Sequence, residues 1–98
     1  MLPRVISQDI VKYLHEVKGF SIEEIANIVS MPVSNIKLIL KGLDTFSCEN
    51  IKSLIEKQKI SVISILSEAC PEEHLPEKLQ KNVILYKHVQ KVKQKKVK

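Results

Sequence analysis

Side chains that commonly perform catalysis or bind metals are few in this 98-residue chain, and they are scattered along it. Cys48 has no histidine near it in the sequence, and Cys70 and His74 share a short turn without further ligands. The three histidines and two cysteines do not form the H-x-x-x-H or C-x-x-C spacing typical of zinc sites. Adjacent carboxylates at 23–24 and 72–73 suit helix starts and a solvated linker, and no glycine-rich loop could hold a phosphate. We therefore predict that the protein is not an enzyme and has no catalytic residues, no metal and no cofactor.

A different chemistry is available between residues 33 and 41, where small polar and basic side chains occur at helical spacing. If Ile36, Ile39 and Leu40 face inward, the remaining side chains face outward. An asparagine near the start of such a helix can bond bidentately to adenine, and lysines four residues apart can contact phosphates or guanine. The side chains predicted to contact DNA are Val33, Ser34, Asn35, Lys37, Leu38 and Lys41.

The sequence around this segment predicts two short helices with a tight turn between them. Ser21 and Glu24 have the spacing of a capping box, which indicates a helix start. Met31-Pro32 should end that helix, because a residue before proline avoids the α conformation. Gly42 should end the second helix in the left-handed conformation. Two such helices form the helix-turn-helix unit that presents its second helix to the DNA major groove.

Capping residues also mark the flanking helices. Ser7 is predicted to cap a first helix that closes at Gly19, while Ser47 and Ser61 should open a fourth and a fifth helix. No strand-like alternation is present in the sequence. We expect an all-α fold, a small helix-turn-helix bundle of five short helices over about residues 7–70, followed by a longer basic amphipathic C-terminal helix.

A set of residues between Ser21 and Ile65 occurs in the register of a known family: Glu23-Glu24-x-Ala26, Ile36, Ile39, Gly42, Ser47, Ile51, Leu54 and Ile60-Ser61. On these residues the segment resembles the phage-repressor type of helix-turn-helix domain, the Cro/C1 or XRE group with the lambda-repressor-like fold. The resemblance covers about half of the chain and implies a transcriptional regulator that binds double-stranded DNA, with paired subunits on half-sites about one helical turn apart.

Several positions depart from the pattern of this family. Ile22 stands where a glutamine often contacts phosphate, and Val33 stands where a polar or basic residue usually begins the reading helix. Leu38 and Leu40 align with a frequent Arg and Glu. These apolar side chains favour an alternative function, a protein–protein interaction module on a helix-turn-helix scaffold that binds another regulator or polymerase.

The charge is unevenly distributed. Residues 78–98 contain eight lysines and no acidic residue, whereas residues 1–77 contain eight basic and eleven acidic residues. We therefore divide the chain into a helix-turn-helix domain (1–70), a linker (71–77) and a basic helix with its tail (78–98). The basic segment should attract a polyanion, and we predict that Lys87, Lys91 and Lys95 contact phosphates. Two alternatives use the same lysines: a C-terminus that is simply solvated, and nonspecific binding of nucleic acid.

The predicted C-terminal helix, from about Glu77 to the mid-90s, carries both apolar and basic side chains. An exposed apolar half must pack on the core, pair with a second copy or lie on a membrane, and the helix lacks Trp and Phe membrane anchors. We expect a homodimer through Leu79, Val83, Tyr86 and Val89. On a helical wheel we assign Leu79, Val83, Leu85, Tyr86, Val89 and Val92 to the apolar half, and Lys81, Lys87, His88, Lys91 and Lys95 to the basic half.

The sequence predicts a cytoplasmic location. No apolar run approaches eighteen residues, and the N-terminus lacks a long apolar segment and carries an early Asp9. Without a secretion signal, Cys48 and Cys70 are expected to be reduced thiols.

Overall fold

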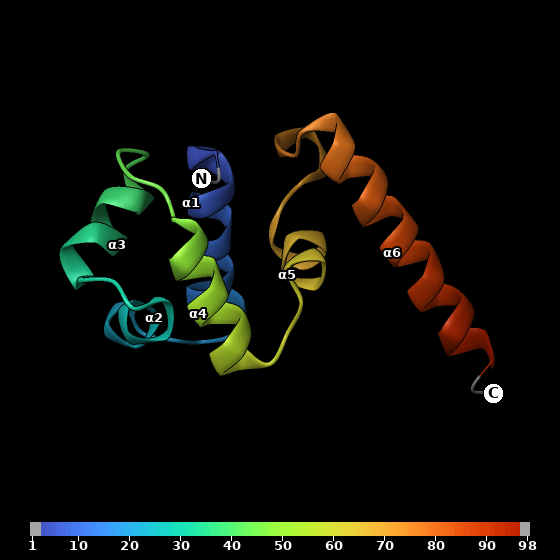
Figure 1. Cartoon of the computed structure of the whole chain (residues 1–98), viewed down its shortest axis with the longest axis horizontal. Helices are drawn as coiled ribbons and strands as arrows, with labels where there is room; N and C mark the ends of the chain where they lie inside the picture. The colour runs from blue at the N-terminus through green and yellow to red at the C-terminus, as the bar shows by residue number, and fades with distance from the viewer. Residues whose placement is uncertain (1–2, 97–98) are drawn as a thin grey trace.

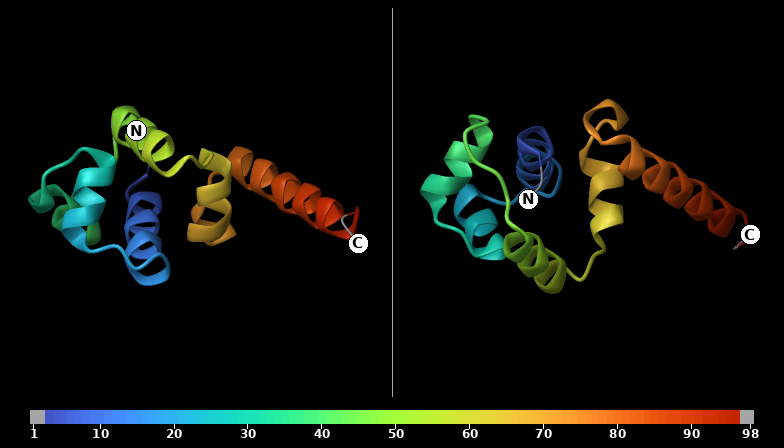
Figure 2. Two further views of the ribbon diagram at one scale, coloured as in Figure 1. Left: turned by 90° about the horizontal axis from the view of Figure 1, so that it is seen from below. Right: turned by 45° about the horizontal axis from the view of Figure 1, so that its top comes forward.

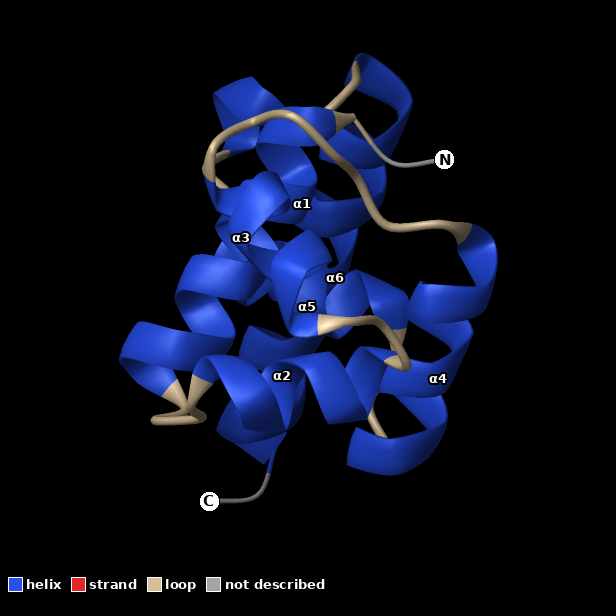
Figure 3. Cartoon of the chain, turned by 90° about the vertical axis from the view of Figure 1, so that its left-hand side faces the viewer, coloured by secondary structure: helices blue, strands red, loops and turns tan. Residues whose placement is uncertain are grey.

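The chain folds into six α-helices in the part that the structure describes, residues 3–96, with side chains described through Lys91. Figure 1 shows the computed structural model, and Figure 3 shows helices and loops without a strand in this described part. The all-α prediction is confirmed. The helices are α1 (Arg4–Lys12), α2 (Ile22–Val29), α3 (Val33–Leu40), α4 (Cys48–Gln58), α5 (Val62–Ala69) and α6 (Glu77–Lys96).

The first helix begins earlier than its sequence indicates. It starts at Arg4 with Pro3 at the N-cap and no side-chain cap, so the prediction that Ser7 caps it is wrong. Ser7 lies inside the helix and is fully buried. Its Oγ lies 2.8 Å from Thr45 Oγ1 and accepts a hydrogen bond from the Phe46 N–H at 3.1 Å. Ser7 therefore holds the loop that follows α3 against α1.

The predicted caps of α2, α4 and α5 are confirmed. The Ser21 Oγ accepts from the Glu24 N–H while the Glu24 carboxylate accepts from the Ser21 N–H, which completes a capping box at the start of α2. Ser47 forms the same arrangement with Asn50 at the start of α4. Ser61 caps α5 by accepting from an N–H in its first turn. These contacts satisfy amides that have no partner within the helix, and they fix where each helix begins.

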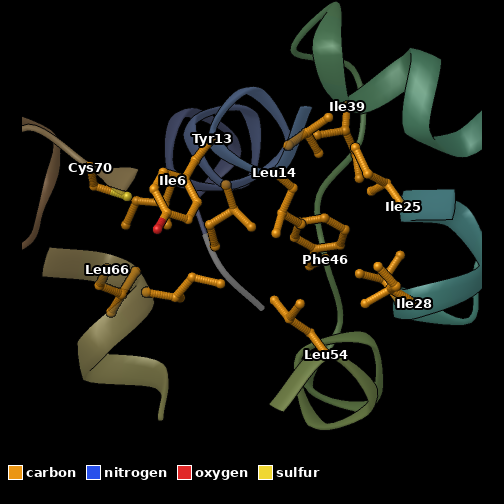
Figure 4. Packing of buried hydrophobic residues seen from close by; sticks show 14 of the residues in the cluster. Ile6, Tyr13, Leu14, Ile25, Ile28, Ile39, Phe46, Leu54, Leu66 and Cys70 are labelled. Carbon is orange, nitrogen blue, oxygen red and sulfur yellow. The ribbon is translucent and has the colours of Figure 1, made fainter. Parts of the chain in front are cut away.

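Helix α1 occupies the centre of the molecule. It packs against α3 on one side and α5 on the other, while α2 contacts both α3 and α4 (Figures 1 and 2). The ring of Phe46, which follows α3 in the chain, fills the space between Leu14, Ile28 and Leu54 (Figure 4). One core thus joins all these helices. Its largest fully buried side chains are Phe46, Ile6, Ile10, Leu14, Ile25, Ile36, Ile39, Leu54, Leu66, Val11, Val29 and Val83.

Helix α6 packs on α5 and then extends away from the body of the molecule (Figures 1 and 2). Val83 is fully buried, whereas Leu85 is 62% exposed. Two residues that are two positions apart lie about 200° apart around a helix and cannot share a face. The prediction that both belong to one apolar half is therefore wrong. Leu75, in the predicted linker, is also buried in the core after a 3-10 turn at Glu72–His74.

Candidate nucleic-acid interface

Helix α3 lies at one end of the molecule, with its inner side on α1 and α2 (Figure 1). Ile36 and Ile39 are fully buried and hold the helix on the core. The outer side carries Ser34, Lys37, Leu38 and Lys41, all of which are exposed. Four of the six residues predicted to contact DNA therefore share an accessible surface, which we call the α3 surface.

Asn35, which is half-buried, forms a hydrogen bond within the chain. Its Nδ2 donates to Asp44 Oδ2 at 3.0 Å, and Asp44 Oδ1 accepts from the Thr45 N–H at 2.8 Å. The Asn35 hydrogen bond, followed by the Thr45 bond and the charge of Arg4, holds the pKa of the Asp44 carboxyl below its ordinary value. A bidentate contact to adenine would have to use the second hydrogen of Nδ2 together with Oδ1. In the free chain Asn35 anchors the start of α3 to the following loop, and base reading by Asn35 stays a prediction.

The C-terminal end of α3 is anchored as well. Gln8 Nε2 on α1 donates to the Leu40 carbonyl oxygen at 3.1 Å. Gly42 adopts a φ of +75°, and a Cβ there would lie 3.2 Å from Gln8 Nε2, so this glycine provides both the left-handed turn and the room for Gln8. The Leu43 N–H donates to the Leu38 carbonyl at 2.9 Å, which closes the helix end. Both ends of α3 are thus fixed by polar contacts.

Helix α4 fixes the turn that leads from α2 into α3. The last carbonyl groups of an α-helix lack the amide partner that those in its interior have, and α4 supplies three donors to the last carbonyl groups of α2. Asn50 Nδ2 donates to the Val29 oxygen at 2.9 Å, and Ser53 Oγ donates to the Ile28 oxygen at 2.8 Å. Lys57 Nζ donates to the Asn27 oxygen at 2.6 Å. The α2–α3 turn is therefore tied to a third helix and presents α3 at a defined angle.

Apolar side chains interrupt the polar character of the α3 surface. Leu38 is 38% exposed and Leu43 is 62% exposed, and the backbone bond between them brings the two residues together at the end of α3. Val33, also predicted to contact DNA, is half-buried and packs against the core. Lys37 and Lys41 flank this apolar patch. The α3 surface therefore combines two cations with the exposed Leu38, and Leu43 adds a second exposed leucine beside it.

The start of α2 offers little to a phosphate. Ile22, at the position where the resembled family often has glutamine, is half-buried and packs against the core. Glu23 is exposed beside it. An acidic side chain at a helix N-terminus is favourable for the helix dipole, and it opposes the approach of an anion. The positive charge at this end of the molecule therefore comes from the exposed α3 lysines.

The lysines predicted to contact phosphates lie at the opposite end of the molecule, on α6 (Figure 1). Lys87 and Lys91 are exposed. Lys87 Nζ lies 3.9 Å from Glu72 Oε1, an ion pair in which both side chains are about half exposed. Lys95 belongs to α6, but its side chain lies outside the described residues. The two predicted contact regions are thus separated along the longest axis of the chain, which measures 45 Å.

The face of α6 predicted to join two copies is largely covered by the chain itself. Val83 is fully buried and Leu79 is partly buried against the same core. Tyr86 is half-buried, and Val89 is 39% exposed. A dimer through Leu79 and Val83 would require α6 to leave α5, so these two residues are corrected to internal packing. The homodimer itself stays a prediction.

Sequence reasoning missed a polar cluster between α1 and the segment before α6. Asp9 Oδ2 lies 2.8 Å from His74 Nδ1, and Asp9 also accepts a hydrogen bond from the Cys70 thiol. Burial, and then the Asp9 charge, raise the pKa of Cys70 to about 12, so the thiol stays protonated and is a poor nucleophile. Beside this cluster the Tyr13 hydroxyl donates to the Glu68 carboxylate. No local motif signals these contacts, because their partners are far apart in the sequence.

These polar groups secure the fold and do not form a metal site. In the described part of the chain, no three His, Cys, Asp or Glu side chains are placed to hold a metal ion. Nor does any described helix have the length and apolar character needed to cross a membrane. In comparisons with known proteins, no family model, no curated protein and no solved structure matches this chain.

Proposed function

We propose that the chain is a DNA-binding transcriptional regulator of helix-turn-helix type that places α3 in the major groove. A short helix presented at the end of a small helical domain suits this groove, which admits one α-helix. Within the proposal, Lys37 and Lys41 contact phosphates or guanine, Ser34 contacts a base edge, and Leu38 contacts a thymine methyl group.

The observation that carries the proposal is the anchoring of α3 at both ends while its outer surface stays accessible. Asn35–Asp44 fixes the start of the helix, and Gln8–Leu40 fixes its end. A fixed helix loses little conformational freedom when it enters a groove, which favours binding. With Asn35 engaged internally, base recognition relies on fewer polar side chains than the resembled family uses, so we expect modest sequence preference.

Selection of duplexes from a random DNA pool by the full chain tests this proposal. The selected duplex is then titrated at several salt concentrations with the Lys37→Gln/Lys41→Gln variant. If each lysine neutralises one phosphate, the slope of log K against log salt should become about 1.8 units shallower. The matched control is Lys52→Gln/Lys59→Gln, which removes two exposed lysines from a different part of the surface and should change the slope little. Equal effects of the two pairs would reject α3 as the contact.

A second candidate function, a protein-interaction module, is favoured by one specific observation. Leu38 and Leu43 are exposed together at the end of α3, and an accessible pair of leucines suits an apolar partner better than a phosphate backbone. Under this function the partner would be another regulator or a polymerase subunit. Leu38→Ser/Leu43→Ser should then abolish binding to the purified partner, while Lys37→Gln/Lys41→Gln should weaken it less. A larger loss of DNA binding from Lys37→Gln/Lys41→Gln than from Leu38→Ser/Leu43→Ser would support the first function.

A further inference from the structure

The two basic surfaces of this chain, the α3 surface and α6, lie at opposite ends of the molecule. The α3 surface forms one end of the 45 Å long axis, and α6 extends from the other (Figures 1 and 2). The fully buried Ile36 and Ile39 hold the inner side of α3 toward α1, so Lys37 and Lys41 face away from the body. Electrostatic attraction between exposed charges is screened beyond about 8 Å at physiological salt. A duplex bound at α3 therefore attracts the lysines on α6 only weakly.

The charge on α6 is not neutralised by the rest of the chain. Its exposed lysines Lys78, Lys81, Lys87 and Lys91 lie along the helix, and no acidic residue follows Glu77 in the sequence. Glu72 pairs with Lys87 at the long distance of 3.9 Å, and among the described residues this is the one lysine–carboxylate ion pair. Exposed pairs of this kind are weak. The helix therefore presents uncompensated positive charge to solvent.

We propose that α6 is a second DNA-backbone surface, independent of α3, so that one chain can hold two duplex segments at once. The inference rests on the proposed function, because it takes the α3 surface as the first DNA contact. The occupant of α6 is duplex DNA because exposed lysines run along the helix, and DNA is a polyanion that carries regularly spaced negative charge. The exposed apolar residues are Ile84, Leu85 and Val89. Leu85 and Val89 share one side of the helix, but this pair is shorter than the repeated stripe through which two helices of separate copies would pack.

A bridging assay tests this inference. A biotinylated duplex is fixed on beads, the full chain is added, and capture of a second, fluorescent duplex of unrelated sequence is measured. The α6 variant Lys81→Gln/Lys87→Gln/Lys91→Gln alters exposed lysines, removes only the weak Lys87–Glu72 pair and leaves the buried Val83 in place, so we expect α6 to stay packed on the core. The matched control is Lys12→Gln/Lys52→Gln/Lys59→Gln, which removes the same charge from exposed positions elsewhere.

The wild-type chain and the control should capture the second duplex, whereas the α6 variant should lose capture and still bind a single duplex through α3. If the three lysines contact three phosphates, they should contribute about 2.7 units to the slope of log K against log salt for capture of the second duplex by the wild-type chain. Single-duplex binding without capture by the wild-type chain would overturn the inference and leave the proposed function standing. Capture that persists in the α6 variant would also overturn it and would assign bridging to a second copy. If the wild-type chain bound no duplex at all, the proposed function would fail together with the inference.

Discussion

Replacing Val83 by alanine tests whether α6 packs on its own chain. The fully buried Val83 lies in the core that α5 and α6 share. Loss of two methyl groups removes roughly 1.6 kcal/mol of transfer free energy, at about 0.8 kcal/mol per carbon group, and the cavity adds to the loss. We therefore expect the free energy of unfolding to fall by about 2 kcal/mol. For a chain of 98 residues this corresponds to a decrease in Tm of roughly 8–16 °C.

Leu85→Ala is the matched control on the same helix. It removes one more carbon than Val83→Ala, but Leu85 is 62% exposed, so its substitution should change stability by less than about 0.5 kcal/mol. Urea unfolding of both variants, followed by circular dichroism, gives the comparison, and the m-value should stay constant. A larger loss from Leu85→Ala than from Val83→Ala would refute the placement of α6. Sedimentation of the Val83→Ala variant gives an independent test. A change in its oligomeric state would show that Val83 contacts a second copy of the chain.

Three further outcomes follow from the described contacts. A thiol reagent should modify the exposed Cys48 quickly. The buried Cys70, whose pKa is raised to about 12, should react only as fast as the chain unfolds. Fast modification of both thiols would contradict the burial of Cys70. Burial, and then the Glu68 carboxylate, raise the pKa of Tyr13 from 10.0 to about 12. The contribution of the protonated Tyr13 hydroxyl to the free energy of unfolding should therefore be complete below pH 10 and lost as the pH rises through 12. Urea unfolding measured at several pH values should show this dependence in the wild-type chain and not in Tyr13→Phe. Ser7→Ala leaves a buried backbone N–H without its acceptor and should cost about 1–3 kcal/mol in urea unfolding, whereas Ser34→Ala, at an exposed position, should cost little.

The ends of most helices could be predicted from local sequence because the groups that cap them are local. Ser21 and Glu24 are three residues apart, and their reciprocal bonds form within one helical turn. Gly42 marks the end of α3 because few other residues adopt a positive φ without strain. The same local signal was misleading at Ser7, whose hydroxyl bonds to a loop 38 residues away instead of capping its own helix.

The site was harder to predict because its polar side chains have partners elsewhere in the fold. The sequence placed Asn35 on α3 correctly, but the hydrogen bond to Asp44 depends on how the following loop returns to the helix. Likewise, Asp9 and His74 are 65 residues apart, and no spacing rule connects them. On α6, helical geometry alone separates Val83 from Leu85, so the apolar half predicted from the sequence is too broad.

The central claim, that α3 is the DNA contact, is tested most directly by NMR titration of the isotopically labelled full chain with a selected duplex. The proposed function predicts that amide chemical shifts change along residues 33–43, with a second set of changes on α6 at higher DNA concentration. Changes confined to α6, with residues 33–43 unaffected at saturating DNA, would contradict the claim.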